Sequence, residues 1–230
     1  MLSDLTALLG AAPVSSERLD YVSAVTESNC LGKPTASTRR LSAQRLSELY
    51  GLDPAIALFR VFRRLWDLDT KSRKLLALLL AIARDPLLAA TAGTIISLPD
   101  GSELQREVAR HALRRLSGER FNPSILDKVL RNAASSWTQS GHLEGRTFKK
   151  RRAVEPTVYT AIFALYLAHF AGFRGIDLFS SGWFAVLDCN PGRARELALD
   201  AKRLGLIDLR IAGDVVDLRL DRLELQSAQG

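Results

Sequence analysis

The chain has 230 residues, of which 47% are hydrophobic and 25% charged, and this composition excludes an intrinsically disordered protein. Its 32 lysines and arginines exceed its 25 acids, so the formal net charge is +7, which favours a polyanionic partner such as nucleic acid. Two distant cysteines and three scattered histidines form no metal-ligand pattern, so we expect no metal site and no cofactor.

No membrane or export signal is expected. The first ten residues, MLSDLTALLG, contain an acid and no basic segment, unlike a secretory signal. The two most apolar runs, 75–83 and 159–173, are shorter than the roughly 20 residues that cross a bilayer. We therefore expect both runs to be core helices of a cytoplasmic protein.

The first half of the chain is predicted to be a helical bundle. Residues 1–36 form a poorly patterned N-terminal segment. Ser37 or Thr38 then caps a helix that Gly51 stops. The next three helices each begin with an aspartate followed by proline or threonine. These aspartates are Asp53, Asp69 and Asp85.

Two further helices follow. Ser102 and Gln105 have the spacing of a capping box for a helix that ends near Gly118. Asn122-Pro123 opens the second helix, whose apolar residues recur at helical spacing. Its opposite face carries Lys128, Arg131, Asn132, Ser135 and Gln139. Ser, Asn and Gln are weak helix formers, but they suit contacts with phosphates and base edges.

A basic loop comes directly after this helix. Gly141 stops the helix, and His142-Leu143 resembles the first step of a wing strand. Segment 145–152 then holds five cations and no acid: Arg146, Lys149, Lys150, Arg151 and Arg152. A solvated linker can have the same composition, but a loop in this position is where a wing meets the DNA backbone. Residues 124–152 therefore predict a winged helix that binds DNA.

The end of the chain repeats the helix-and-hairpin pattern. Buried helices are expected over 157–171 and 176–187, followed by a helix over 193–204 and strands over 206–211 and 215–220. The hairpin tip is short and acidic, and Leu199 falls within the helix face that would meet DNA. We expect a packing or protein-interaction module here, with DNA contact as the alternative.

The predicted fold is mainly α, a helical bundle with two winged-helix-like modules, each a helix-turn-helix plus a β-hairpin. The expected organisation is an N-terminal segment (1–36), a helical domain that ends in the winged-helix-like unit with the basic wing (37–155), a C-terminal winged-helix-like domain (156–225) and a frayed tail (226–230).

Three stretches carry a resemblance to a known family: STRRLSAQRLSELY, LDKVLRNAASSWTQSGHLEG with the basic loop, and RARELALDAKRLGLIDLRIAGDVVDLRL. In their order, over roughly residues 36–222, the chain resembles the BrxA family of BREX phage-defence systems. The resemblance implies a small cytoplasmic DNA-binding protein that acts beside a methyltransferase, an ATPase and a phosphatase-like partner. It supplies no catalytic residue.

The sequence thus predicts a non-catalytic protein that binds double-stranded DNA in a bacterial anti-phage system. A winged-helix transcriptional regulator and a protein adaptor that uses the Leu199 face and the C-terminal hairpin are the alternatives. Asp208 with Asp214 or Asp217 could be imagined as a nuclease metal site. Solvated strand and turn positions explain these acids better, so we expect no enzyme.

Overall fold

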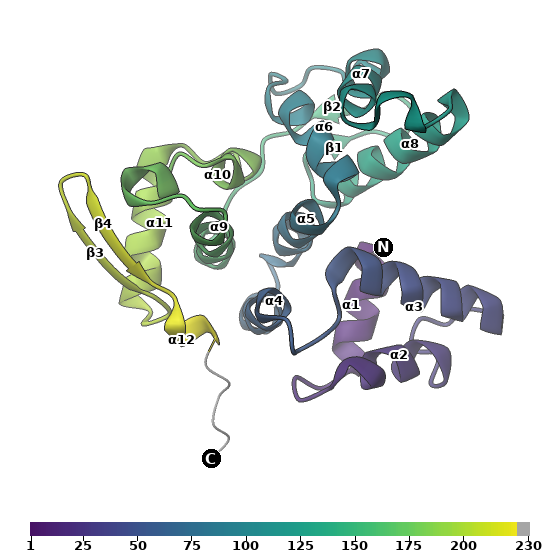
Figure 1. Ribbon diagram of the computed structural model, residues 1–230, viewed down its shortest axis with the longest axis horizontal. Helices are drawn as coiled ribbons and strands as arrows, with labels where there is room; N and C mark the ends of the chain where they lie inside the picture. The colour runs from purple at the N-terminus through teal and green to yellow at the C-terminus, as the bar shows by residue number, and fades with distance from the viewer. Residues whose placement is uncertain (225–230) are drawn as a thin grey trace.

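The computed structural model describes residues 1–224, the side chain of Glu119 apart, so the tail expected at 226–230 lies outside the described residues. The described chain is mainly helical and has two small antiparallel hairpins, which confirms the mainly α prediction. Figure 1 shows α4 and α5 in the middle, with α1–α3 and α6–α8 to one side and α9–α11 with β3 and β4 to the other. None of the described helices combines the length and the hydropathy of a membrane span.

The N-terminal segment is more regular than its sequence suggests. It contains α1 (Leu2–Ala11) and α2 (Arg18–Thr26); α1 packs against α2, and α2 packs against α3 (Ala36–Tyr50). Only Tyr21 and Val25 of α2 are buried, so this short helix has too few apolar positions to give a clear period. Its start uses an acidic cap, since the carboxylate of Asp20 accepts the backbone N–H of Glu17 at 2.7 Å.

Four helices with short connections follow the N-terminal pair. Thr35 caps α3, since its hydroxyl accepts the Thr38 N–H at 3.2 Å. The predicted cap, Ser37 or Thr38, lies two or three residues beyond the observed one. Gly51 ends α3 in the left-handed region as predicted. The next helices are α4 (Ala57–Leu68), α5 (Arg73–Arg84) and α6 (Pro86–Ile96).

Of the three aspartates predicted to begin helices, one does so. Asp85 caps α6 through the backbone N–H groups of Leu87 and Leu88. Asp53 and Asp69 instead accept a backbone N–H two residues on, and their helices begin four residues later. The same side-chain bond can close a turn or cap a helix, so the aspartate alone does not distinguish the two.

The capping box predicted at Ser102 is wrong, because residues 102–104 run extended beside β2 (Lys150–Arg151). The Arg151 N–H donates to the Ser102 carbonyl at 2.8 Å, and the Leu104 N–H donates to the Lys149 carbonyl at 2.7 Å. The helix α7 (Arg106–Ser117) begins only afterwards. The backbone partners of this stretch lie some fifty residues away, which local sequence cannot reveal.

Beyond α7, the chain forms η1 (Gly118–Arg120), α8 (Pro123–Gln139) and β1 (Leu143–Glu144). Asn122 caps α8 by accepting the Ile125 N–H at 2.9 Å. β1 pairs antiparallel with β2, so β2 has a partner on each side: β1, and the extended residues 102–104.

The core centres on α9 (Val158–Phe170), in which every residue from Thr160 to Ala168 is buried. This helix packs against α4 and α5, where the rings of Phe163 and Phe62 lie 6.0 Å apart. One continuous apolar cluster therefore includes residues from both sides of the domain boundary expected near residue 155.

The C-terminal elements are η2 (Gly175–Leu178), α10 (Gly182–Val186), α11 (Pro191–Arg203), β3 (Asp208–Ala212), β4 (Val215–Arg219) and α12 (Asp221–Glu224). The helix predicted over 176–187 is broken, because the Ser181 hydroxyl donates to the Leu178 carbonyl and closes a buried turn. Leu199 is only half exposed and packs against the core. The exposed Leu199 face expected for an adaptor is therefore wrong.

Gly51 provides a test of the α3 ending. Its φ is +67°, and a Cβ there would lie 2.7 Å from the Arg84 guanidinium. We expect Gly51→Ala to lower the free energy of unfolding by roughly 1 to 2 kcal/mol in urea denaturation. Gly10→Ala, on α1 with nothing within 4 Å of the added methyl, is the matched control. The control should be unchanged or more stable, and an equal loss in both variants would contradict the assignment.

Candidate nucleic-acid interface

The inner face of α8 fixes which of its residues point outward. Leu126, Leu130, Ala133 and Trp137 are buried at helical spacing. The Trp137 indole N–H donates to the buried Thr91 hydroxyl of α6 at 2.8 Å, which also sets the rotation of the helix about its axis. The opposite face of α8 is thereby turned to solvent.

This outer face is polar and free of acids. Lys128, Arg131, Asn132 and Ser135 are all exposed, as the sequence predicts. Within the described chain, the two cations have no ion-pair partner. The helix has one acid, Asp127, which turns toward α7 and pairs with Arg110 at 2.7 Å. The positive charge of the face is therefore available to a ligand.

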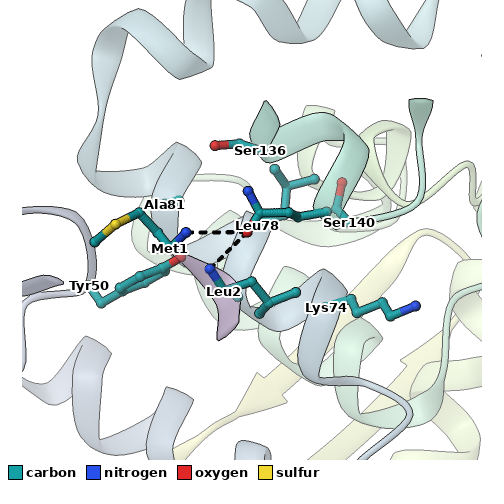
Figure 2. A pocket seen from close by; sticks show the side chains of 10 residues that line it. Met1, Leu2, Tyr50, Lys74, Leu78, Ala81, Ser136 and Ser140 are labelled. Carbon is teal, nitrogen blue, oxygen red and sulfur yellow. Dashed lines mark hydrogen bonds between the residues drawn. The ribbon is translucent and has the colours of Figure 1, made fainter. Parts of the chain in front are cut away.

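Gln139, which was predicted to share this face, is occupied elsewhere. Its side-chain oxygen accepts the Leu2 backbone N–H at 2.9 Å and the Met1 amine at 3.4 Å (Figure 2). Its amide nitrogen donates to the Ser135 hydroxyl at 2.9 Å. Gln139 thus joins α8 to α1 beside a cavity of about 20 Å³, which has room for little more than one water.

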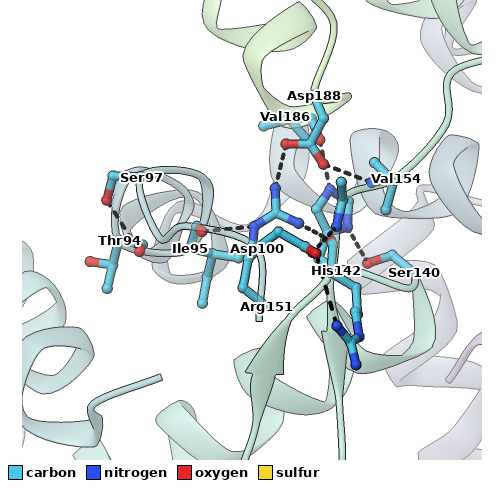
Figure 3. Close-up of polar contacts among 12 residues, drawn as sticks. Thr94, Ile95, Ser97, Asp100, Ser140, His142, Arg151, Val154, Val186 and Asp188 are labelled. Atoms are coloured by element: carbon cyan, nitrogen blue, oxygen red, sulfur yellow. Dashed lines mark hydrogen bonds and ion pairs between the residues drawn. The ribbon is translucent and has the colours of Figure 1, made fainter. Parts of the chain in front are cut away.

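Arg151 is the largest correction to the predicted site. Its side chain is 3% exposed and forms an ion pair with Asp188, while its Nε donates to the Ile95 carbonyl at 3.1 Å (Figure 3). Successive residues of a strand point to opposite sides, so Lys150 faces solvent and Arg151 faces the interior. Arg151 cannot reach a phosphate. It is a structural residue that connects β2 to α6 and to the segment after α10.

His142 lies beside this ion pair and is fully buried. Its Nε2 donates to the Val186 carbonyl at 2.7 Å, and its Nδ1 lies 2.8 Å from the Ser140 hydroxyl. Burial lowers the pKa of His142 below the ordinary value, and the nearby charge of Arg151 acts in the same direction. The imidazole is therefore neutral at pH 7 and forms part of the junction.

Acids from neighbouring strands offset the charge at the base of the wing. Arg152 pairs with Glu144 at 2.6 Å and approaches Asp100 at 3.9 Å, and the hydrogen bond to Glu144 raises the pKa of the guanidinium. Lys150 lies in register between Glu144 on β1 and Glu103 on the other side. No acid occurs within residues 145–152, but acids from other segments lie beside Lys150 and Arg152 and offset part of their charge.

The turn of the β1–β2 hairpin, residues 145–149, keeps its positive charge. Gly145 has φ +101°, and a Cβ there would lie 2.2 Å from the Phe148 carbonyl, so the turn requires glycine. The Lys149 ammonium donates to the Gly145 carbonyl across the turn. Arg146 is exposed and has no partner among the described side chains. The predicted cations that remain available are therefore Lys128, Arg131, Arg146 and, in part, Lys149.

The C-terminal module pairs several of its cations with acids, although Arg195 and Lys202 of α11 stay exposed without an ion-pair partner in the described residues. On α11, Arg193 pairs with Glu196 and Arg203 pairs with Asp200. On the hairpin, Asp208 lies opposite Arg219 and Arg210 lies opposite Asp217. Two of the acids imagined as a nuclease site, Asp208 and Asp217, thus lie opposite arginines, and no cluster of three metal-ligating side chains occurs in residues 1–224.

Removing the Arg151 side chain should destabilise the fold. In Arg151→Met the Asp188 carboxylate loses its cation in a largely covered position, so we expect a loss of about 3 to 5 kcal/mol in chemical denaturation. Arg146→Met removes the same charge from an exposed site and should cost less than about 0.5 kcal/mol. Similar small losses in both variants would show that Arg151 lies on the surface.

The buried imidazole predicts a pH dependence of stability. The unfolded chain takes up a proton at His142 near its ordinary pKa of about 6.5, whereas the folded chain resists protonation. The free energy of unfolding should therefore fall as the pH drops below about 6.5. His142→Gln should make this decline shallower, and His111→Gln, at an exposed position, should leave it unchanged. If the free energy of unfolding declined equally with pH in the wild-type protein, His142→Gln and His111→Gln, the prediction would be refuted.

No protein-family model, no curated protein and no solved structure matches this chain. Its function is therefore inferred from its own side chains and their geometry.

Proposed function

We propose that this protein is a non-catalytic binder of double-stranded DNA, with the outer face of α8 as its main contact. The observation that carries the proposal is the acid-free, exposed face of α8, with Lys128 and Arg131 unpaired, followed in the chain by a hairpin turn that exposes Arg146. Such a surface suits the phosphate backbone, which supplies most of the affinity in non-specific DNA binding.

The arrangement around α8 supports this reading. Two successive helices, α7 and α8, are followed by a hairpin whose second strand pairs on both sides. This is the order of a winged helix, in which α8 would be the recognition helix and residues 145–149 the wing. An α-helix fits the major groove of B-DNA, and a wing then lies over the neighbouring backbone or groove.

The expected binding mode relies on charge more than on base reading. Apart from Lys128 and Arg131, which we place on phosphates, the exposed face offers only Asn132 and Ser135 to base edges, and the Ser135 hydroxyl already accepts a bond from Gln139. Four available cations should give a slope of about −3 to −4 in a plot of log affinity against log salt. We therefore propose weak sequence preference.

The biological setting is proposed from the resemblance to BrxA proteins. It would make this chain a cytoplasmic component of an anti-phage system with a methyltransferase and an ATPase as neighbours, and those genes beside its own would support the assignment.

A transcriptional regulator would instead form a dimer on a palindromic site. An adaptor is favoured by one observation: the C-terminal module exposes Phe170, Ile176 and Val215. Stable capture of a protein without any DNA binding would support that alternative.

A pair of charge-matched variants tests the DNA-binding face. Lys128→Ala/Arg131→Ala should weaken binding to a 30-base-pair duplex roughly tenfold or more at 0.1 M salt and reduce the salt slope by about 2, because two phosphate contacts are lost. Fluorescence anisotropy across a salt series measures both quantities.

The control is Arg195→Ala/Lys202→Ala, which removes two exposed cations from α11. Its net charge equals that of the Lys128→Ala/Arg131→Ala variant. This variant should keep the affinity and the slope of the unmodified protein. Equal losses in both double variants would mean that overall charge, and not the α8 face, attracts the DNA, and the proposed interface would be wrong.

A further inference from the structure

Phe148 is an exposed aromatic residue in the turn of the β1–β2 hairpin. It is 66% exposed at the tip of the wing, whereas Leu143 and Leu104 at the base of the same hairpin are buried. A single exposed apolar residue is common on protein surfaces and by itself implies nothing. What distinguishes Phe148 is how firmly the chain on each side of it is held and which charges surround it.

The backbone on both sides of Phe148 is fixed. On one side, the tight turn at Gly145 brings the Phe148 carbonyl so close that no Cβ fits at the glycine. On the other, the Lys149 carbonyl accepts the Leu104 N–H at 2.7 Å, and the Lys149 ammonium reaches back to Gly145. Two residues further, Arg151 secures β2 in the interior. The ring therefore projects from a closed, anchored turn.

The charges around the ring indicate the chemistry of its partner. Arg146 and Lys149 flank Phe148 within the turn, and residues 145–149 contain no acid. An apolar groove on a protein would have to desolvate these cations, whereas a nucleic acid neutralises them with phosphates and offers its stacked bases to the ring. Charge complementarity therefore favours duplex DNA over an apolar protein surface.

We infer that Phe148 is a wedge that enters the minor groove beside the α8 contact and partly unstacks one base step. The inference rests on the proposed DNA binding and adds a specific deformation to it. Exposed apolar side chains next to minor-groove cations act in this way in proteins that kink DNA. Pyrimidine–purine steps such as TA unstack most easily, so binding should favour duplexes that contain them at the wedge position.

The test uses the full chain and a duplex with 2-aminopurine at a central TA step, whose fluorescence rises when the base loses its stacking. Wild-type protein should raise this fluorescence on binding. Phe148→Ala should abolish the rise and weaken affinity by roughly 5- to 50-fold, while the salt slope stays unchanged because every cation remains. Phe148→Trp should restore the rise. Val215→Ala, which removes another exposed apolar side chain at the tip of the β3–β4 hairpin, should have no effect.

The outcomes separate the wedge from DNA binding itself. If wild-type protein and Phe148→Ala bind equally and neither raises the fluorescence, the wedge is refuted while the α8 interface stands. If Phe148→Ala loses affinity in proportion to a fall in salt slope, the variant has disturbed the cations of the turn, and the wedge is likewise refuted. If wild-type protein does not bind the duplex at any salt concentration, both the proposed function and the wedge fail.

Discussion

The ion pair between Arg151 and Asp188 connects parts of the chain that are far apart in sequence. Through it and the bond to the Ile95 carbonyl, β2 is attached both to the end of α6 and to the segment after α10. His142, which directly precedes β1, makes a second connection to the segment around α10, because its imidazole donates to the Val186 carbonyl. A buried charge is tolerated only where such partners compensate it, so this junction fixes the base of the wing against the body of the protein.

The fixed base determines which charges the wing can offer. Alternate residues of β2 point inward and outward, so one cation of the basic run goes to the interior and the next stays outside. Pairing on both sides of β2 then brings Glu144 and Glu103 next to the outward Lys150. Only the turn beyond the sheet escapes this neutralisation, and it is there that Arg146 and Phe148 project. The strand pairing therefore leaves the turn at residues 145–149 as the part of the β1–β2 hairpin whose positive charge has no acid beside it.

The two helix-and-hairpin units share an outline but differ in electrostatics. On α8 the single acid, Asp127, is drawn toward α7, which leaves the solvent face positive. On α11 the acids lie three residues from arginines and pair with them, and the C-terminal hairpin alternates opposite charges across its strands. Arg195 and Lys202 of α11 also stay exposed without an ion-pair partner in the described residues, but Glu196 and Asp200 lie on the same helix. We therefore propose DNA contact for the first unit, whose solvent-facing helix surface carries no acid, although the second has the longer hairpin.

The sequence by itself determined the helical class, the Gly51 ending of α3, the Asp85 and Asn122 caps and the polar face of α8, because local hydrogen bonds and helical periodicity fix these features. It could not determine the helices before residue 36, the extended segment at 102–104 or the contacts of the Gln139 and Arg151 side chains. The last three depend on partners far along the chain: β2 for residues 102–104, Leu2 for Gln139 and Asp188 for Arg151. Only the tertiary structure decided which cations remain free, since burial and cross-strand neighbours, and not composition, set the charge that a ligand meets.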